Sequence, residues 1–200
     1  MVTAAEGANG RTWPAILTWR SHDVSRIESV RVQLSGNRIK AIGRIAAAAS
    51  DQHPAFSASY DLVTDDSGAT KRLSLNVSTA ERDRQLSIAR DEENMWLITG
   101  HGGDSREAFE GAVDVDMMFS PFFSTLAIRR AGLHRAAETV NLPVVYVYLP
   151  DLSITPATVS YSSAGPDDVA IKVQSPTAEA TVIVDDDGFI VDYPGLAERI

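Results

Sequence analysis

Short runs in which apolar and polar side chains alternate recur along most of this 200-residue chain. In residues 27–34, for example, Val30, Val32 and Leu34 occupy every second position. Comparable runs cover residues 72–78, 84–90, 112–118, 144–150 and 180–185. Because successive side chains of a strand point to opposite faces of its sheet, each run predicts a half-buried β-strand.

Residues that favour tight turns separate these runs. Glycine, asparagine, aspartate and serine cluster at residues 35–37, 65–68, 91–94 and 186–188. Such residues accept positive φ or hydrogen-bond to their own backbone, which suits hairpin connections. Many short strands joined by hairpins favour an antiparallel sheet that closes or nearly closes. We therefore predict a mainly β protein built on a many-stranded, barrel-like antiparallel sheet.

Two segments depart from this pattern. Residues 99–108 are polar and glycine-rich, and we expect a loop there. Residues 121–130 begin with a proline suited to a first helical turn and continue with good helix formers. We therefore predict one short helix near 121–130, which divides the strands into two groups. The alanine-rich residues 41–50 fit either a helix or a strand, and we favour a strand because their neighbours favour one.

Composition and charge narrow the possible partners. The formal net charge of −9 argues against nucleic acid, because phosphate binding needs a positive surface. The chain has no cysteine and its four histidines are widely scattered, so we predict no cofactor and no metal site. No run is apolar enough to span a bilayer and the start lacks a secretory pattern, so we expect a cytoplasmic protein. We expect residues 1–14 to be a flexible N-terminus and residues 15–200 to form a single β-barrel-like domain; the oligomeric state is left open.

Residues 113–130 read VDVDMMFSPFFSTLAIRR and place four charges in the most hydrophobic neighbourhood of the chain. On a strand, Asp114 and Asp116 point to the same face. They can line a solvent face, or they can lie inside the barrel opposite Arg129 and Arg130. A lone buried charge is costly, whereas a guanidinium can hold a carboxylate through two parallel hydrogen bonds. Inside the barrel such pairs can fix the structure, contact a ligand, or do both.

This stretch resembles the signature of a bacterial family first catalogued as a domain of unknown function and named putative glycolipid-binding. The matching residues are Asp114, Asp116, Pro121, Phe122, Thr125, Leu126, Ile128, Arg129 and Arg130. Further matches within residues 15–200 are Trp19, Arg20, Glu28, Gly43, Tyr60, Trp96, Leu149, Pro150, Tyr161, Asp185, Gly188, Asp192, Tyr193 and Pro194. The chain departs from the pattern at Phe123 and Ser124, where the family has Thr-Asn, and at Ala127, where it has proline. A ligand contact from that asparagine is therefore not carried over.

The resemblance implies a barrel-like β-structure akin to the Lol-type carriers of lipidated proteins, with an apolar internal cavity that binds a lipid or glycolipid. The implied ligand-binding residues are Trp19, Arg20, Glu28, Asp114, Asp116, Arg129, Arg130, Tyr161 and Tyr193. The charged ones can fix the barrel and orient a polar head group. The aromatic ones can stack against a sugar or simply pack in the core.

Two other functions fit the same residues. An enzyme of hydrolase or isomerase type could act on a lipid-like substrate with Asp114 or Asp116 as general acid or base, because a carboxyl in a dry barrel can have a raised pKa. Against this, no nucleophile or metal cluster accompanies the acids, and we name no catalytic residue. In the third case the barrel core is filled and the charges only fix its packing. Turnover of a bound ligand separates an enzyme from a carrier, and the absence of a cavity favours the filled barrel.

Overall fold

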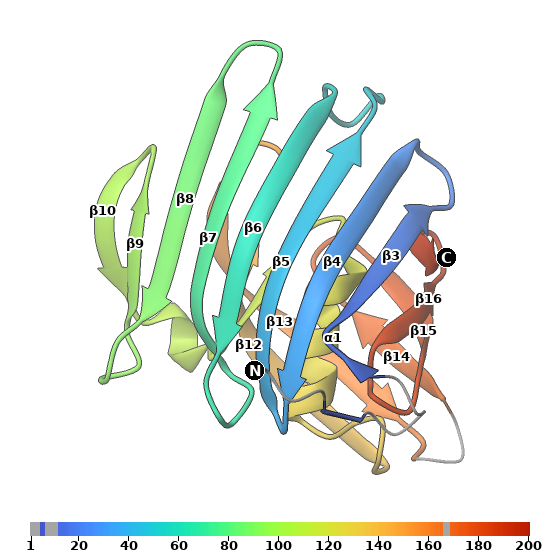
Figure 1. Ribbon diagram of the computed structural model, residues 1–200. Coiled ribbons are helices and arrows are strands. Elements are labelled where there is room, and N and C mark those ends of the chain that lie inside the picture. Colours follow the sequence, from blue (N-terminus) through green and yellow to red (C-terminus); the bar gives the residue numbers. More distant parts are fainter. Residues whose placement is uncertain (1–4, 7–11, 166–168) are drawn as a thin grey trace.

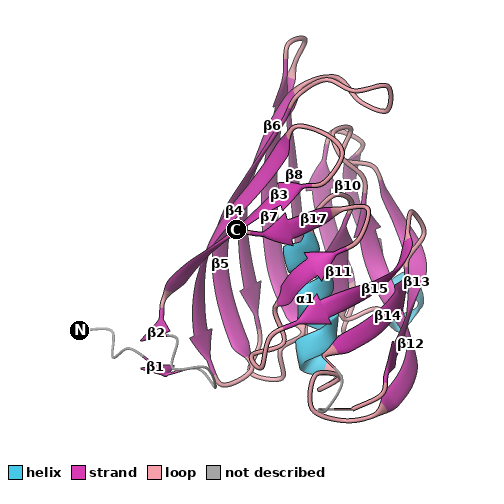
Figure 2. Cartoon of the chain, turned by 90° about the vertical axis from the view of Figure 1, so that its right-hand side faces the viewer, coloured by secondary structure: helices cyan, strands magenta, loops and turns pink. Residues whose placement is uncertain are grey.

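The computed structural model describes residues 5–6, 12–165 and 169–200. Fifteen strands of the described chain form one sheet, which curls around α1 (Figures 1 and 2). The prediction of a flexible segment over residues 1–14 falls largely on residues outside the described ones. Within that segment, β1 (Ala5–Glu6) and β2 (Thr12–Trp13) form a small separate antiparallel pair.

The first group of strands is an antiparallel meander in which sequence neighbours pair. It consists of β3 (Ala15–Ser21), β4 (Arg26–Ser35), β5 (Arg38–Ala47), β6 (Phe56–Thr64), β7 (Thr70–Thr79), β8 (Asp83–Arg90), β9 (Trp96–Gly100) and β10 (Gly103–Glu107). A one-turn 3₁₀ helix, η1 (Phe109–Gly111), then leads to β11 (Asp114–Met117) and α1 (Pro121–Arg130).

The second group returns along the other side of the helix. It consists of β12 (Glu138–Val147), β13 (Ile154–Ser163), β14 (Ala170–Gln174), β15 (Glu179–Val184), β16 (Ile190–Tyr193) and β17 (Ala197–Arg199). β17 pairs with β3 and so joins the two groups, while β11 pairs in parallel with β12. The sheet order therefore runs from β10 to β11, and within the described residues these two end strands do not pair with each other. The sheet is curled and barrel-like, and it stays open between its two edge strands, β10 and β11.

The helix fills the middle of the curl (Figure 2). Every residue from Pro121 to Ile128 is buried. On one side, Phe122, Phe123 and Leu126 pack with inward-facing apolar residues of β4 to β7. On the other side, Ala127 and Ile128 pack with residues of β12 to β16. At the level of α1 most of the interior is thus occupied by side chains.

Several expectations from the sequence are confirmed. The protein is mainly β, residues 121–130 form the predicted helix, and the alanine-rich stretch is a strand as far as Ala47. The loop predicted over residues 99–108 was wrong, because this segment contains most of the β9–β10 hairpin. All five residues of β10 are exposed, so the strand has no buried face and its sequence shows no apolar alternation. Gly103 follows the turn with φ of +96°, a value that suits glycine.

Candidate functional site

The stretch with four charges folds into β11, a short turn and α1. Ser120 is the N-cap of the helix and its hydroxyl accepts a hydrogen bond from the backbone N–H of Phe123. Pro121 takes the first helical position, where a missing N–H costs nothing. Arg129 and Arg130 occupy the last turn, where positive charge complements the helix dipole. The N-cap and the two C-terminal arginines therefore stabilise a helix that begins shortly after the strand carrying the two aspartates.

Asp114 and Arg130 form the predicted kind of inner ion pair. The Arg130 guanidinium donates to Asp114 Oδ2 from Nε at 2.9 Å and from Nη2 at 2.7 Å. The Asp114 side chain is 1% exposed and that of Arg130 is 21% exposed. Burial raises the pKa of Asp114 and the adjacent guanidinium opposes that shift. This pair ties the end of α1 to β11.

Asp116 has no such partner. Its Oδ1 accepts hydrogen bonds from the backbone N–H of Met117, at 2.8 Å, and from the Ser124 hydroxyl, at 3.4 Å. Within the described part of the chain, no arginine or lysine forms an ion pair with it. Burial raises the pKa of Asp116 to about 7. The carboxyl is therefore able to change its ionisation near neutral pH.

Glu28 connects three elements of the fold. Its Oε1 accepts hydrogen bonds from the Tyr60 hydroxyl, at 2.7 Å, and from the Ser120 hydroxyl, at 2.6 Å. Tyr60 on β6 reaches Glu28 on β4 by crossing Gly43 on β5, where a Cβ would lie 2.1 Å from the tyrosine Cζ. Burial raises the pKa of Glu28 to about 7, although both hydrogen bonds favour the charged form. Glu28 thus holds the start of α1 against the sheet.

Arg129 lies away from both aspartates of β11. Its guanidinium stacks over the ring of Phe189, with the Cζ 4.9 Å from the ring centroid. Among the described residues its Nε and Nη1 have no hydrogen-bond partner, and burial lowers its pKa to about 10. The turn between β15 and β16, which includes Gly188, covers this side chain. Arg129 therefore packs under that turn, and it is Arg130 alone of the two arginines that pairs with Asp114.

The remaining predicted residues are spread over the fold. Trp19 is buried and its indole N–H donates to the carbonyl of Ile190 at 2.9 Å. Arg20 is exposed and forms an ion pair with Glu198 on the neighbouring strand β17. Tyr161 is buried in the second core cluster. Tyr193 on β16 lines a hollow together with Asp116, and it is described with that hollow below.

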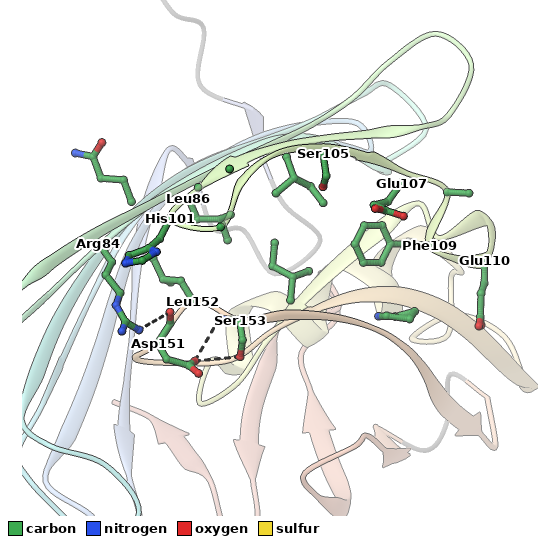
Figure 3. Close-up of a pocket in the computed structure, with 18 residues that line it drawn as sticks. Arg84, Leu86, His101, Ser105, Glu107, Phe109, Glu110, Asp151, Leu152 and Ser153 are labelled. Carbon is green, nitrogen blue, oxygen red and sulfur yellow. Dashed lines mark hydrogen bonds between the residues drawn. The ribbon is translucent and has the colours of Figure 1, made fainter.

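A hollow of about 840 Å³, here called the large hollow, lies between the β8–β10 end of the sheet and the turn from β12 to β13 (Figure 3). Its apolar side chains are Leu86, Ile98, Phe109, Leu152, Ile154 and Pro156. Its polar side chains include Arg84, His101, Ser105, Glu107, Glu110 and Asp151. None of the residues predicted from the sequence lines it. Its two walls are more than forty positions apart in the chain, so no local motif could have indicated it.

A second hollow of about 370 Å³, here called the polar hollow, contains Asp116. Its other polar side chains include Arg26, Ser124, Tyr146, Ser175, Thr177 and Tyr193. They come from β4, α1, β12, the turn between β14 and β15, and β16. Of the residues predicted from the sequence, this hollow brings together Asp116 and Tyr193. The hydroxyl residues of the β14–β15 turn were missed, because a Ser-x-Thr turn is common in any β protein.

A third hollow of about 420 Å³, the linking hollow, lies between the other two. It shares Arg84, Asp151 and Ser153 with the large hollow, and Gln52 and Met118 with the polar hollow. Where the large and linking hollows meet, Arg84 Nη1 donates a hydrogen bond of 2.7 Å to the carbonyl of Asp151 (Figure 3). The linking hollow therefore borders both the large hollow and the polar hollow.

These features define a curled β-sheet protein whose centre is filled by a helix and whose hollows lie between the two halves of the sheet. The chain belongs to the family described as "Putative glycolipid-binding", whose model matches residues 16–199. The crystal structure of a DUF1089 family protein from Pseudomonas aeruginosa has the same fold, with a TM-score of 0.70 at 24% identity over 91% of this chain and 95% of that chain. No curated protein matches the chain. Among the described residues, no helix is long and apolar enough to cross a membrane.

Proposed function

We propose that the protein binds a lipid or glycolipid and holds its apolar chain in the large hollow. The observation that carries this proposal is a hollow of about 840 Å³, lined in part by apolar side chains and placed between β8–β10 and the β12–β13 turn, in a member of a family described as glycolipid-binding. Sites for small molecules have volumes of roughly 300–1,000 Å³ and mainly apolar walls with a few polar groups. The large hollow has a volume in this range, and six apolar side chains line it beside its polar ones.

Burial of an acyl chain supplies enough free energy for such binding. Each methylene removed from water contributes about 0.8 kcal/mol, so ten methylenes contribute about 8 kcal/mol before the entropic costs of association. The edge strand β10 and the 3₁₀ helix η1 line the large hollow, so the ligand can enter beside that edge of the sheet. We therefore place the ligand between β8–β10 and the β12–β13 turn, and not along a central barrel axis that α1 already fills.

In this proposal, the buried charged residues that the sequence predicted, other than Asp116, have a structural role. Asp114 and Arg130 satisfy each other, and Glu28 is held by two hydroxyl groups. Arg129 packs on the ring of Phe189. None of these four residues lines the large, linking or polar hollow. We assign them to fixing the curled sheet around α1.

The proposal is tested by placing a charge in the apolar wall. Ile154 on β13 lines the large hollow and is partly exposed, so Ile154→Asp introduces a carboxylate where the acyl chain would lie. Ile42→Asp is the matched control, because Ile42 is 47% exposed on β5 and does not line the large hollow. Titration with a fluorescent sixteen-carbon acyl probe should show binding weakened at least tenfold by Ile154→Asp, and unchanged by Ile42→Asp. Equal binding by both variants would place the acyl chain elsewhere.

A second candidate function is an enzyme acting on a lipid-like substrate with Asp116 as general acid or base. It is favoured by one observation, the pKa of about 7 that burial gives this carboxyl in a hollow lined with hydroxyl groups. Asp114 is less suited to the role, because Arg130 holds it by two hydrogen bonds. Mass analysis of a ligand after incubation separates the two functions: a carrier returns the ligand unchanged, whereas an enzyme returns a product.

A further inference from the structure

The polar hollow has a wall chemistry that differs from that of the large hollow. Asp116, Ser124, Tyr146 and Tyr193 line it, and each of these side chains is at least nine-tenths buried. Burial raises the pKa of Tyr193 to about 12, and that of Tyr146 further still, so both phenols keep their protons at neutral pH. The wall thus combines one carboxyl group with several hydroxyl groups that can both donate and accept.

Asp116 has hydrogen-bonding capacity left for a ligand. Both of its hydrogen bonds are accepted by Oδ1, and within the described chain Oδ2 accepts none. The Tyr146 hydroxyl and the Thr177 hydroxyl lie 2.7 Å apart across the hollow wall, so one hydrogen of this pair remains for another acceptor. A molecule in the hollow can therefore donate to Asp116 and exchange hydrogen bonds with the tyrosine–threonine pair.

The charges around the polar hollow favour an uncharged ligand. Among the described residues, three acids line it, Asp23, Asp116 and Glu179, against the single cation Arg26. Arg26 is already engaged, with its guanidinium 4.4 Å above the ring of Phe119 and a hydrogen bond of 3.2 Å to Ser21 Oγ. An anionic phosphate would be repelled by this acidic surface. An ammonium group can only donate hydrogen bonds, so the hydroxyl donors of the hollow would have no acceptor on it. Vicinal hydroxyls, as on a sugar ring, both donate and accept.

From this geometry, and resting on the lipid-binding function proposed above, we infer that the polar hollow is a separate subsite for an uncharged polyhydroxyl head group. The Asp116 carboxylate accepts from its hydroxyls, and Thr177 and Tyr146 complete the contacts. A volume of about 370 Å³ suits one small polar group and not a long acyl chain. The linking hollow, which shares wall residues with both neighbours, offers the path between head group and acyl chain.

The test compares lipids that differ only in the head group. Binding of a monohexosyl diacylglycerol, the matching diacylglycerol, a phosphatidylethanolamine and a free methyl hexoside is measured for the wild-type chain, Asp116→Asn and Asp66→Asn. Asp66 is an exposed acid in the turn after β6 and serves as the matched control. Wild type should bind the hexosyl lipid about tenfold or more tightly than the diacylglycerol, since loss of a hydrogen bond to a charged group has this effect. Asp116→Asn should abolish this preference, and Asp66→Asn should keep it.

The outcomes separate this inference from the lipid-binding function. Equal binding of the hexosyl lipid and the diacylglycerol by wild type would overturn the subsite and leave the lipid function standing. A preference for phosphatidylethanolamine that Asp116→Asn removes would also overturn it, because the subsite would then select an amine. Binding of the free methyl hexoside alone, lost in Asp116→Asn, would support the polyhydroxyl subsite and overturn the lipid function.

Discussion

Asp116 should make the fold less stable as the pH rises, and its replacement by asparagine should remove this contribution. The pKa of the carboxyl is 3.8 when unperturbed and about 7 in the folded protein. Below pH 4 the group is protonated in both states and contributes no difference. Between pH 4 and 7 the unfolded chain loses the proton while the folded chain retains it, so the free energy of unfolding falls as the pH rises. Above pH 7 the full cost remains.

The size of the effect follows from the shift in pKa. Each pKa unit corresponds to about 1.4 kcal/mol, so the rise from 3.8 to about 7 corresponds to about 4 kcal/mol. In the Asp116→Asn variant the amide oxygen would still accept from the Met117 N–H, and the amide nitrogen would face the polar hollow, where water can accept from it. We therefore expect Asp116→Asn to be up to about 4 kcal/mol more stable than wild type at pH 8, and almost equal at pH 4.

Urea unfolding of both proteins at pH 4, 6 and 8 measures this difference directly. Glu28 shifts in the same direction, but it is present in both proteins and cancels in the comparison. Asp116 does not carry this cost if Asp116→Asn is no more stable than wild type at pH 8, or if the difference between the two proteins does not grow with pH. Either result would mean that the buried carboxylate has a charge partner or ready access to solvent.

Three further variants test the structural contacts by urea unfolding at pH 7. Asp114→Asn should lower the free energy of unfolding by about 3 kcal/mol, because Arg130 loses its partner, and an unchanged value would show that the pair contributes nothing. Gly43→Ala should lower it by about 2 kcal/mol or more, since the new methyl displaces Tyr60; no loss would mean that the ring can move freely. Ser120→Ala should lower it by about 1–2 kcal/mol or more through loss of both the helix cap and the hydrogen bond to Glu28, and wild-type stability would contradict both contacts.

The sequence predicted the sheet and the helix because both depend on local patterns. The alternation predicted over residues 72–78 matches β7, in which Leu73, Leu75 and Val77 are buried, and α1 starts at the proline that suits a first turn. The hairpin of β9 and β10 was not predicted. The edge strand Gly103–Glu107 is fully exposed, so its apolar and polar residues do not alternate.

The candidate site was predictable only in part. The Asp114–Arg130 pair could be anticipated from a costly charge next to arginines, yet the choice between Arg129 and Arg130 depended on the exact direction of the last helical turn. The hollows could not be anticipated, since their walls join residues near 84–110 to residues near 151–156. That meeting depends on how far the sheet curls, which is set by the packing of two strand groups on α1 and not by any one segment.

Native mass spectrometry of freshly purified protein, followed by solvent extraction and lipid analysis of any adduct, tests whether this protein holds a lipid. We expect an adduct with one lipid per chain, recovered chemically unchanged, and reduced or absent in Ile154→Asp while Ile42→Asp retains it. A bare protein mass, together with no binding of added acyl lipids or glycolipids, would contradict it and favour a protein in which the charges and the helix serve only to fill and fix the sheet.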